Sequence, residues 1–169
     1  AGEDFRLEFD TAAGTLARWQ AAGVDLLLAG PQVKLWKAPV DNERGQADEW
    51  RRGGCNRLLW ETQSVELVGM RHAAAQSAVN GLLQPYGNKV HFTVRQLWTV
   101  YGSGDVVLTT TVTPHNTKDW LGSLPRIGLE LVLPAACENY AWYGLGPHEC
   151  YPDRRQSGRL DVHRSTVRN

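Results

Sequence analysis

The stretch KVHFTVRQLWTV, residues 89–100, decides the fold class of this chain. Its apolar side chains recur at every second position: Val90, Phe92, Val94, Trp98 and Val100. Only Gln96 interrupts the series, and a period of two is typical of a β-strand with one buried face. The turn-forming residues 101–105 and the β-branched run 106–113 follow directly, which predicts an antiparallel hairpin.

Further strands are expected on both sides of this hairpin. Alternating or apolar runs predict them at residues 5–9, 15–19, 24–29, 33–37, 127–133 and 140–143. Pro39 is expected to end the strand that contains Val33, because proline cannot donate to a strand ladder. The one helix candidate is 46–52, with Gly53 as its stop.

These strands predict an all-β fold, an antiparallel β-sandwich, in a single domain over residues 1–169. Glycine and proline are spread along the whole chain, which agrees with many short strands. The last residues, 164–169, show no sign of a finished strand, so we expect the sandwich to be incomplete at its C-terminus. Unpaired strand edges would then favour association into a homo-oligomer.

Charge and composition argue against several classes of partner. The 18 basic residues balance 18 acidic ones, so no net field attracts nucleic acid or an acidic membrane surface. No apolar stretch approaches the ~20 residues that span a bilayer. Cys55, Cys137 and Cys150 are odd in number and lack CxxC spacing, which predicts free, buried thiols in a reducing, cytoplasmic location.

The residues form no clear catalytic or metal-binding pattern. A glycosidase of the common kind needs two carboxyl groups beside the scissile bond. The candidate pairs are Glu43 with Glu49 and Glu149 with Asp153, all in polar segments where a carboxylate ordinarily faces water. The histidines show no zinc-site spacing, and the dense run 148–150 lacks a second cluster of ligands. We therefore assign no catalytic and no metal-binding residue.

Tryptophan is used heavily, at seven positions in 169 residues. Trp98 lies on the apolar face of its predicted strand and is expected in the core. Trp36, Trp120 and Trp142 flank loops, where packing is the first interpretation and stacking on a sugar ring is the alternative. On the residues alone, the chain is a β domain that can face a sugar.

Two regions of the sequence resemble the signatures of one enzyme family. WKAPVDNERG, residues 36–45, resembles a signature near the start of the last, small-chain domain of glycoside hydrolase family 2 β-galactosidases. LPRIG, residues 124–128, and WYGLGPHECYPDR, residues 142–154, resemble the second signature of that domain, and the order and separation are also similar. The matching positions are Lys37, Pro39, Asp41, Asn42, Gly45, Arg126, Gly144, Gly146, Pro147, Glu149, Tyr151, Asp153 and Arg154.

The resemblance implies a domain of a retaining β-galactosidase, which removes terminal non-reducing β-D-galactose in carbohydrate metabolism. The last domain of that family is a supersandwich, similar to galactose mutarotase, beside a catalytic TIM barrel. The catalytic glutamates, magnesium and sodium belong to the barrel, so the resemblance implies no catalytic residue, metal ligand or cofactor in this chain. Its partner would be the barrel of the same polypeptide, and its contact with a β-galactoside would be indirect.

In that family the domain also completes the wall of the active site. One contribution is a mobile loop after the opening strands, a place that residues 21–31 occupy here. Gly23, Asp25 and Gly30 are its candidate residues, and a glycine-bounded loop suits a lid. A plain strand connection is the alternative. A further aromatic sugar platform would lie beyond residue 169.

The signature residues also have a physical interpretation. Asp41 and Asn42 favour local side-chain-to-backbone hydrogen bonds that shape a turn, and Gly45 permits a positive φ. Arg126 and Arg154 can form forked hydrogen bonds that lock loops together. We interpret the signatures chiefly as structural joints facing the barrel, with direct substrate contact as the alternative.

Three hypotheses follow from the sequence. The first is a supporting domain of a β-galactosidase, inactive without the rest of its polypeptide. The second is a stand-alone carbohydrate-binding module, and the third is a free-standing mutarotase, which would need a positioned histidine and glutamate. Hydrolysis of a chromogenic β-galactoside, calorimetric titration with sugars, and polarimetry on galactose distinguish them.

Overall fold

The computed structural model describes residues 4–71, 73–118, 121–151 and 153–168. Two compact units make up the chain: unit 1 is Ala1–Val132 and unit 2 is Leu133–Asn169. Strands are mostly antiparallel in both units, which confirms the all-β class predicted from the sequence. The single-domain organisation over residues 1–169 stays a prediction.

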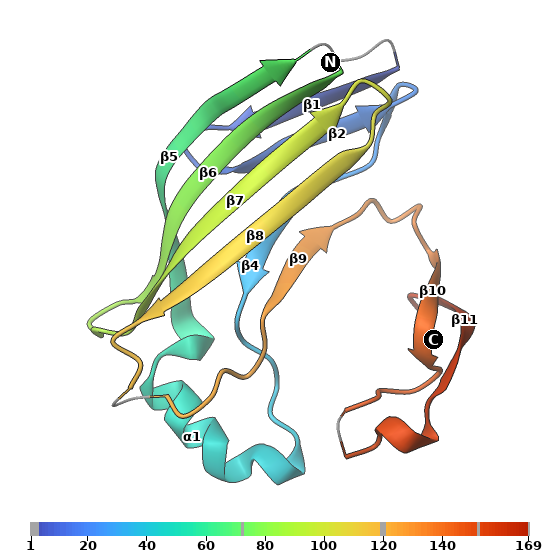
Figure 1. Cartoon of the computed structure of the whole chain (residues 1–169). Helices are drawn as coiled ribbons and strands as arrows, with labels where there is room; N and C mark the ends of the chain where they lie inside the picture. The colour runs from blue at the N-terminus through green and yellow to red at the C-terminus, as the bar shows by residue number, and fades with distance from the viewer. Residues whose placement is uncertain (1–3, 72, 119–120, 152, 169) are drawn as a thin grey trace. The chain divides into compact units, whose positions relative to one another are not determined.

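The largest element of unit 1 is a four-stranded antiparallel sheet (Figure 1). Its strands, in sheet order, are β5 (Leu58–Arg71), β6 (Ala74–Pro85), β7 (His91–Tyr101) and β8 (Val106–His115). The pair β7–β8 is the hairpin expected from the sequence, with Val100 opposite Val106. The backbone N–H of Tyr101 donates to the carbonyl of Asp105 at 2.9 Å and closes its turn.

Shorter strands pack on one face of this sheet and form the second layer of unit 1. Three of them form an antiparallel sheet: β1 (Phe5–Asp10), β2 (Thr15–Ala21) and β3 (Val24–Asp25). The other two, β4 (Ala29–Lys34) and β9 (Gly128–Val132), pair with each other across a long stretch of sequence. Unit 1 is therefore a two-layered antiparallel sandwich.

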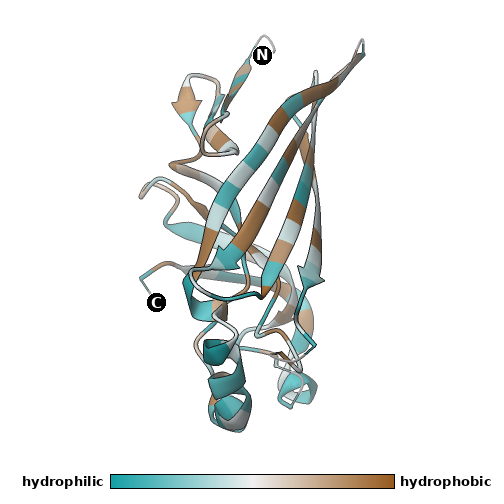
Figure 2. Ribbon diagram, turned by 90° about the vertical axis from the view of Figure 1, so that its left-hand side faces the viewer, coloured by the Kyte–Doolittle hydropathy of each residue, from teal (hydrophilic) through white to brown (hydrophobic). Residues whose placement is uncertain are grey.

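The core of unit 1 lies between these two layers. Trp98 is 2% exposed and meets Phe9 of the second layer edge to face, with ring centroids 5.3 Å apart. Val33 and Leu35 from the second layer pack against Phe92 and its apolar neighbours on the large sheet. Figure 2 shows hydrophobic and hydrophilic residues following one another along the strands, and in β7 their alternation gives one buried face.

One helix, α1 (Arg44–Arg52), follows a 3₁₀ turn, η1 (Asp41–Glu43). It confirms the helix predicted at 46–52, and Gly53 is its C-cap. Trp50 and Ala47 on its inner side are each 2% exposed and pack with Cys55. A second 3₁₀ turn, η2 (Cys55–Arg57), connects the helix to β5.

Unit 2 is built on one antiparallel pair, β10 (Asn139–Gly146) and β11 (Arg159–Thr166), with a 3₁₀ turn, η3 (Arg155–Ser157), between them. The expectation of an unfinished strand over residues 164–169 is wrong, because β11 pairs with β10 through Thr166. The backbone N–H of Val167 then donates to the carbonyl of Glu138 at 3.0 Å. Polar residues in β11 hid this strand from the pattern analysis.

Candidate functional site

The first signature, residues 36–45, folds around a shielded ion pair. The Nζ of Lys37 pairs with Oε2 of Glu43, and the same oxygen accepts a hydrogen bond from the backbone N–H of Val40 at 3.0 Å. The side chains of Lys37 and Glu43 are only 12% and 21% exposed. The Lys37 ammonium also lies 5.9 Å from the ring centroid of Trp50, within cation–π range. The signature is therefore a built joint rather than a solvated loop.

The strand before this joint is shorter than the sequence predicts. β4 ends at Lys34, whose partner in the ladder is Gly128, so the expected continuation to Lys37 is wrong. Leu35 leaves the ladder to enter the core at 1% exposure, and Lys37 turns to its pair with Glu43. The chain stops pairing five residues before Pro39, so proline does not end the strand.

The chain turns at Asp41 and Asn42, but the reason given for Gly45 is wrong. Asp41 lies in η1, and its Oδ1 accepts a hydrogen bond from Nη2 of the Arg44 side chain at 2.6 Å on the surface, rather than the expected bond from the backbone. Gly45 lies in the first turn of α1, and its φ is not positive. A Cβ at this position would meet no atom within 4 Å. Neither backbone conformation nor crowding requires glycine there.

The first part of the second signature, residues 124–128, lies at the same end of the β4–β9 pair as the first signature. Because the two strands are antiparallel and Lys34 faces Gly128, the chain leaves β4 where it enters β9. Segment 121–124 then packs on α1 through Leu121 and Leu124, and Nε1 of Trp50 donates to Oγ of Ser123 at 3.3 Å. Unit 1 thus brings together residues 36–45 and the segment that precedes Arg126.

Arg126 itself is exposed beside Gly128, where its guanidinium lies within 4 Å of the position of an added Cβ. The forked hydrogen bonds expected of Arg126 and Arg154 do not occur among the residues that the structure describes. In unit 2, Arg154 contributes its backbone instead: its N–H donates to the carbonyl of Tyr151 at 2.8 Å, and its carbonyl accepts from Oγ of Ser157 at 2.8 Å. This arrangement shapes the turn that leads into η3.

The rest of the second signature lies in unit 2, where aromatic packing surrounds its glycines. Gly144 and Gly146 are in β10, and the Gly146–Pro147 peptide bond is cis. A Cβ on Gly146 would lie 2.7 Å from Cδ2 of His163, so only glycine fits there. The ring of Trp142 lies 5.1 Å from that of His163, and its Nε1 donates to the carbonyl of Leu145 at 3.2 Å. Trp142 is therefore half-buried and packs against its neighbours within unit 2.

The loop after this strand contains Glu149, Tyr151 and Asp153, all of which are exposed. The Sγ of Cys150 donates to the carbonyl of His148 at 3.2 Å, and the Nδ1 of His148 lies 3.0 Å from the carbonyl oxygen of Glu149. Within the described parts of the chain, no three His, Cys, Asp or Glu side chains gather to hold a metal ion. This run is a hydrogen-bonded loop.

Residues 21–31, the candidate mobile loop, are mostly tied into strands. Gly23 has φ +77° in the turn between β2 and β3, a conformation that favours glycine. Asp25 in β3 receives hydrogen bonds from Arg18 in β2, and these bonds lower its pKa. Gly30 is buried in β4, where a Cβ would lie 2.3 Å from the carbonyl oxygen of Leu16. A gating role for this segment stays a prediction.

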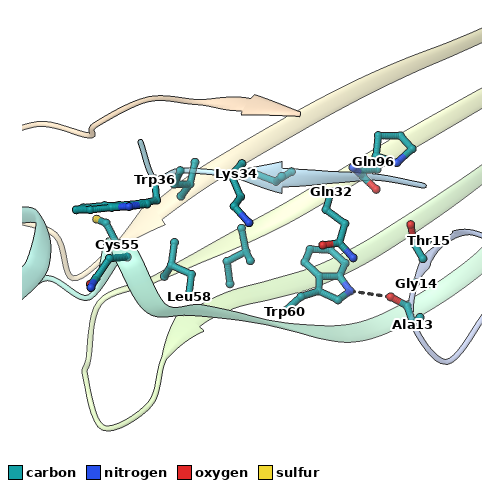
Figure 3. Close-up of a pocket in the computed structure, with 15 residues that line it drawn as sticks. Ala13, Gly14, Thr15, Gln32, Lys34, Trp36, Cys55, Leu58, Trp60 and Gln96 are labelled. Atoms are coloured by element: carbon teal, nitrogen blue, oxygen red, sulfur yellow. Dashed lines mark hydrogen bonds between the residues drawn. The ribbon is translucent and has the colours of Figure 1, made fainter. Parts of the chain in front are cut away.

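A cavity of about 260 Å³ opens between the two layers of unit 1. Figure 3 shows Gln32, Gln96 and Thr15 beside Trp60 at one end of the cavity. Trp36 and Cys55 lie at the other end of the cavity. The Nε1 of Trp60 is held by the carbonyl of Ala13 and by Oγ1 of Thr62, each at 3.0 Å. The cavity thus combines fixed aromatic rings with amide and hydroxyl groups.

The thiol of Cys55 at the cavity wall is 2% exposed, and burial raises its pKa to about 11. It therefore stays protonated and unreactive at neutral pH. Cys137 and Cys150 are also free thiols, as predicted, but the expectation that the thiols are buried is wrong for the exposed Cys137 and the half-buried Cys150. Neither predicted carboxylate pair, Glu43 with Glu49 or Glu149 with Asp153, lines this cavity.

Among the described residues, no helix is long and apolar enough to cross a membrane. The predicted core position of Trp98 is confirmed, and Trp36 packs partly buried against the cluster around Trp50. Trp120, the third tryptophan considered as a sugar platform, lies outside the described residues, as does His72.

Comparison with known proteins identifies the family. The model of the beta galactosidase small chain matches residues 1–169. This chain belongs to the β-galactosidase small-chain family. It is 30% identical to a β-galactosidase of Psychromonas ingrahamii over 174 residues, covering 96% of this chain and 16% of that protein. A β-galactosidase of Vibrio vulnificus is 30% identical over 98% of the chain, and one of Halalkalibacterium halodurans 28% over 98%.

The small-chain segment spans only 16% to 17% of the length of these relatives. Their names describe the whole proteins, of which this chain resembles one part. Within the small-chain segment, the sequence did not single out Trp60 or the Lys37–Glu43 pair. Gln96 was visible as the one break in the apolar series of β7, and that break was the available signal for the cavity.

Proposed function

We propose that this chain is a supporting domain of a retaining β-galactosidase, whose catalytic glutamates lie elsewhere in its polypeptide. It would buttress the catalytic barrel and complete the wall around a terminal non-reducing β-D-galactose residue. The match of the small-chain family model over residues 1–169 carries this proposal. The relatives named β-galactosidase, of which the chain spans 16% to 17%, support it.

The geometry of the first signature suits a supporting role. Lys37 and Glu43 form a shielded pair, so neither charge projects freely toward a substrate. The pair is held against Trp50 of α1, which in turn is anchored to Ser123. Such a joint fixes the course of the backbone, and a fixed backbone is what a neighbouring catalytic domain needs from a support.

Cofactors and other partners belong to the same proposal. Magnesium and sodium would be held by the catalytic barrel and would supply electrostatic stabilisation there. The barrel would be the main partner, and a homo-oligomer formed through strand edges would be a further one. The balanced charge of the chain favours neither nucleic acid nor a membrane surface as a partner, and we propose a cytoplasmic location.

The first test is the activity of the isolated chain. We expect no hydrolysis of a chromogenic β-galactoside, because the proposal places both catalytic carboxyl groups outside residues 1–169. Turnover by the purified chain that disappears in Glu149→Gln would contradict the proposal, since it would place the chemistry in unit 2.

The second test uses the intact enzyme that carries this segment. Lys37→Met keeps the aliphatic stem but leaves the shielded Glu43 carboxylate unpaired, which should cost roughly 1–3 kcal/mol of stability. Activity should fall with no change in the pH profile of kcat/KM, because no titrating catalytic group is removed.

Lys34→Met is the matched control. Lys34 pairs with Glu130 at 3.3 Å, but both side chains are about half exposed, at 44% and 52%, so its loss should cost under about 1 kcal/mol. A shifted pH profile in Lys37→Met, or equal effects of both variants, would argue against a structural joint.

A carbohydrate-binding module remains the second candidate function. The observation that favours it is the cavity, with Trp36 and Trp60 beside amide and hydroxyl groups. Calorimetric titration of the chain with galactose and lactose tests this second function, because a chain without a sugar site should release no binding heat.

A further inference from the structure

We propose that the cavity of unit 1 is a binding site for one neutral, ring-shaped, polyhydroxylated molecule of monosaccharide size. The proposal deepens the carbohydrate-binding alternative and is independent of the supporting role. It rests on the side-chain amides of Gln96 and Gln32, which line the cavity, and on the rings beside them.

Gln96 is the central group of this set. It is 3% exposed and lies on the inner face of β7, in line with Phe92, Val94 and Trp98. Its side chain lines the cavity, and it makes no hydrogen bond within the described part of the chain. Its amide atoms are not among the fully enclosed polar atoms without partners, so a polar occupant of the cavity can reach them and supply hydrogen bonds.

Three unpartnered polar atoms near Gln96 are sealed from the cavity. They are Oγ1 of Thr15, Oγ1 of Thr110 and Nε1 of Trp98, none of which has accessible surface. Thr110 and Trp98 do not belong to the lining of the cavity. A hydroxyl-rich ligand would instead meet the side-chain amides of Gln96 and Gln32, which both line it.

The charges around the cavity favour a neutral ligand. The only ionisable groups among the described lining residues are Lys34 and the thiol of Cys55. Lys34 is paired with Glu130, and Cys55 is protonated at neutral pH because its pKa is raised to about 11. No unpaired positive charge is left to bind a phosphate or a carboxylate. Amides and hydroxyls can bind the hydroxyl groups of a sugar without any charge.

The rings and the volume favour a single sugar ring. Trp60 covers Gly81, where an added Cβ would lie 2.0 Å from its Cη2, and its two hydrogen bonds fix the indole in place. A fixed indole at the cavity wall can stack on the apolar face of a pyranose. The 260 Å³ is just below the usual range of sites for drug-sized ligands, so it suits a smaller molecule.

The test uses the 169-residue chain with D-galactose as ligand and galactitol as the matched open-chain control. Indole N–H signals in NMR, with Trp60 assigned through Trp60→Phe, report where the ligand binds. We expect saturable shifts at Trp60 with a dissociation constant in about the millimolar range, as for other ligands of this size. Galactitol has the same hydroxyl groups but no ring face, so it should bind more weakly.

Two variants then test the lining amides. Gln96→Leu removes the amide and keeps the volume, and it should weaken galactose binding at least about tenfold. Gln32→Leu removes the second lining amide and should also weaken binding. Gln63→Leu makes the same chemical change at an exposed position of β5 and should leave the affinity unchanged. Circular dichroism confirms folding, and if Gln96→Leu fails to fold, Gln32→Leu decides.

Three outcomes would overturn the proposal. No saturable shift at ten times the expected dissociation constant would mean that water alone fills the cavity. Equal affinity in the wild type, Gln96→Leu and Gln32→Leu would place the ligand elsewhere on the chain. Shifts confined to Trp142 would move the site to unit 2, which would retain a carbohydrate-binding function but contradict this assignment.

Discussion

Replacing Gly81 with alanine should destabilise the sandwich by roughly 2–4 kcal/mol. The new Cβ would lie 2.0 Å from Cη2 of Trp60, where no van der Waals contact is tolerated. The indole cannot simply retreat, because hydrogen bonds of 3.0 Å hold its Nε1 to Ala13 and Thr62. Overpacking costs about 1–3 kcal/mol, and each hydrogen bond lost adds about 1 kcal/mol. For a chain of this length the melting temperature should fall by roughly 5–15 °C.

Urea unfolding, followed by far-UV circular dichroism, measures this cost. Gly69→Ala in β5 is the matched control, since its Cβ would have its nearest neighbour at 3.5 Å and the change should be neutral or slightly stabilising. In a Trp60→Phe background the outer ring atoms that cause the clash are gone, so Gly81→Ala should cost less than about 1 kcal/mol. If its cost is the same in both backgrounds within about 0.5 kcal/mol, Trp60 is not the cause and the reasoning fails.

Three further predictions concern the core and the titrating groups. Trp98→Ala should cost roughly 3–5 kcal/mol in urea unfolding, because it empties the centre of the core and ends the contact with Phe9. Burial raises the pKa of Cys55 to about 11, so the folded state favours the neutral thiol. The contribution of this thiol to the free energy of unfolding is therefore fully present below pH 9 and is lost as the pH rises to about 11. Unfolding midpoints measured across that window should therefore fall less in Cys55→Ala than in the wild type. Arg18 lowers the pKa of Asp25 through its hydrogen bonds, so the contribution of this pair to stability is present above pH 3.8, the ordinary pKa, and is lost as the pH falls below it. In acid unfolding, Asp25→Asn should therefore lack this pH-dependent loss of stability.

The sequence predicts strands well where one strand has one uninterrupted buried face. The β7–β8 hairpin is such a case, and so is β1. The two longest strands, β5 and β6, were missed for a physical reason. Irregularities at Thr62/Ser64 and at Leu67/Gly69 shift the register of β5, so its side chains change faces and the alternation disappears. β6 combines small and polar residues, and Gly81 is needed under Trp60.

Burial on β9 could not be predicted from its alternation either. Leu129 and Leu131 alternate as in a half-buried strand, yet they are 43% and 47% exposed. Within the described structure β9 pairs with β4 alone, so it is an edge strand and alternation does not identify what covers its apolar side. Periodicity describes the chain, whereas burial depends on neighbours that are distant in sequence.

The candidate site shows the same division between local and long-range information. The turn at Asp41 and the helix end at Gly53 follow from local residue preferences, and both were predicted. The pairing of Lys37 with Glu43 depends on where β4 ends and on how Trp50 sits on the segment before β9. Such contacts become visible only once strands that are far apart in sequence are placed side by side.

Gln96 shows how much information one break in a pattern can hold. If the cavity were only an imperfection of packing, leucine would suit this position better, because it matches the volume and leaves no amide unpaired. The Gln96 side chain instead lines the cavity, where a hydrogen-bonding occupant can satisfy its amide. A packing defect explains the empty volume alone, whereas an occupant explains both the volume and the polar residue that faces it.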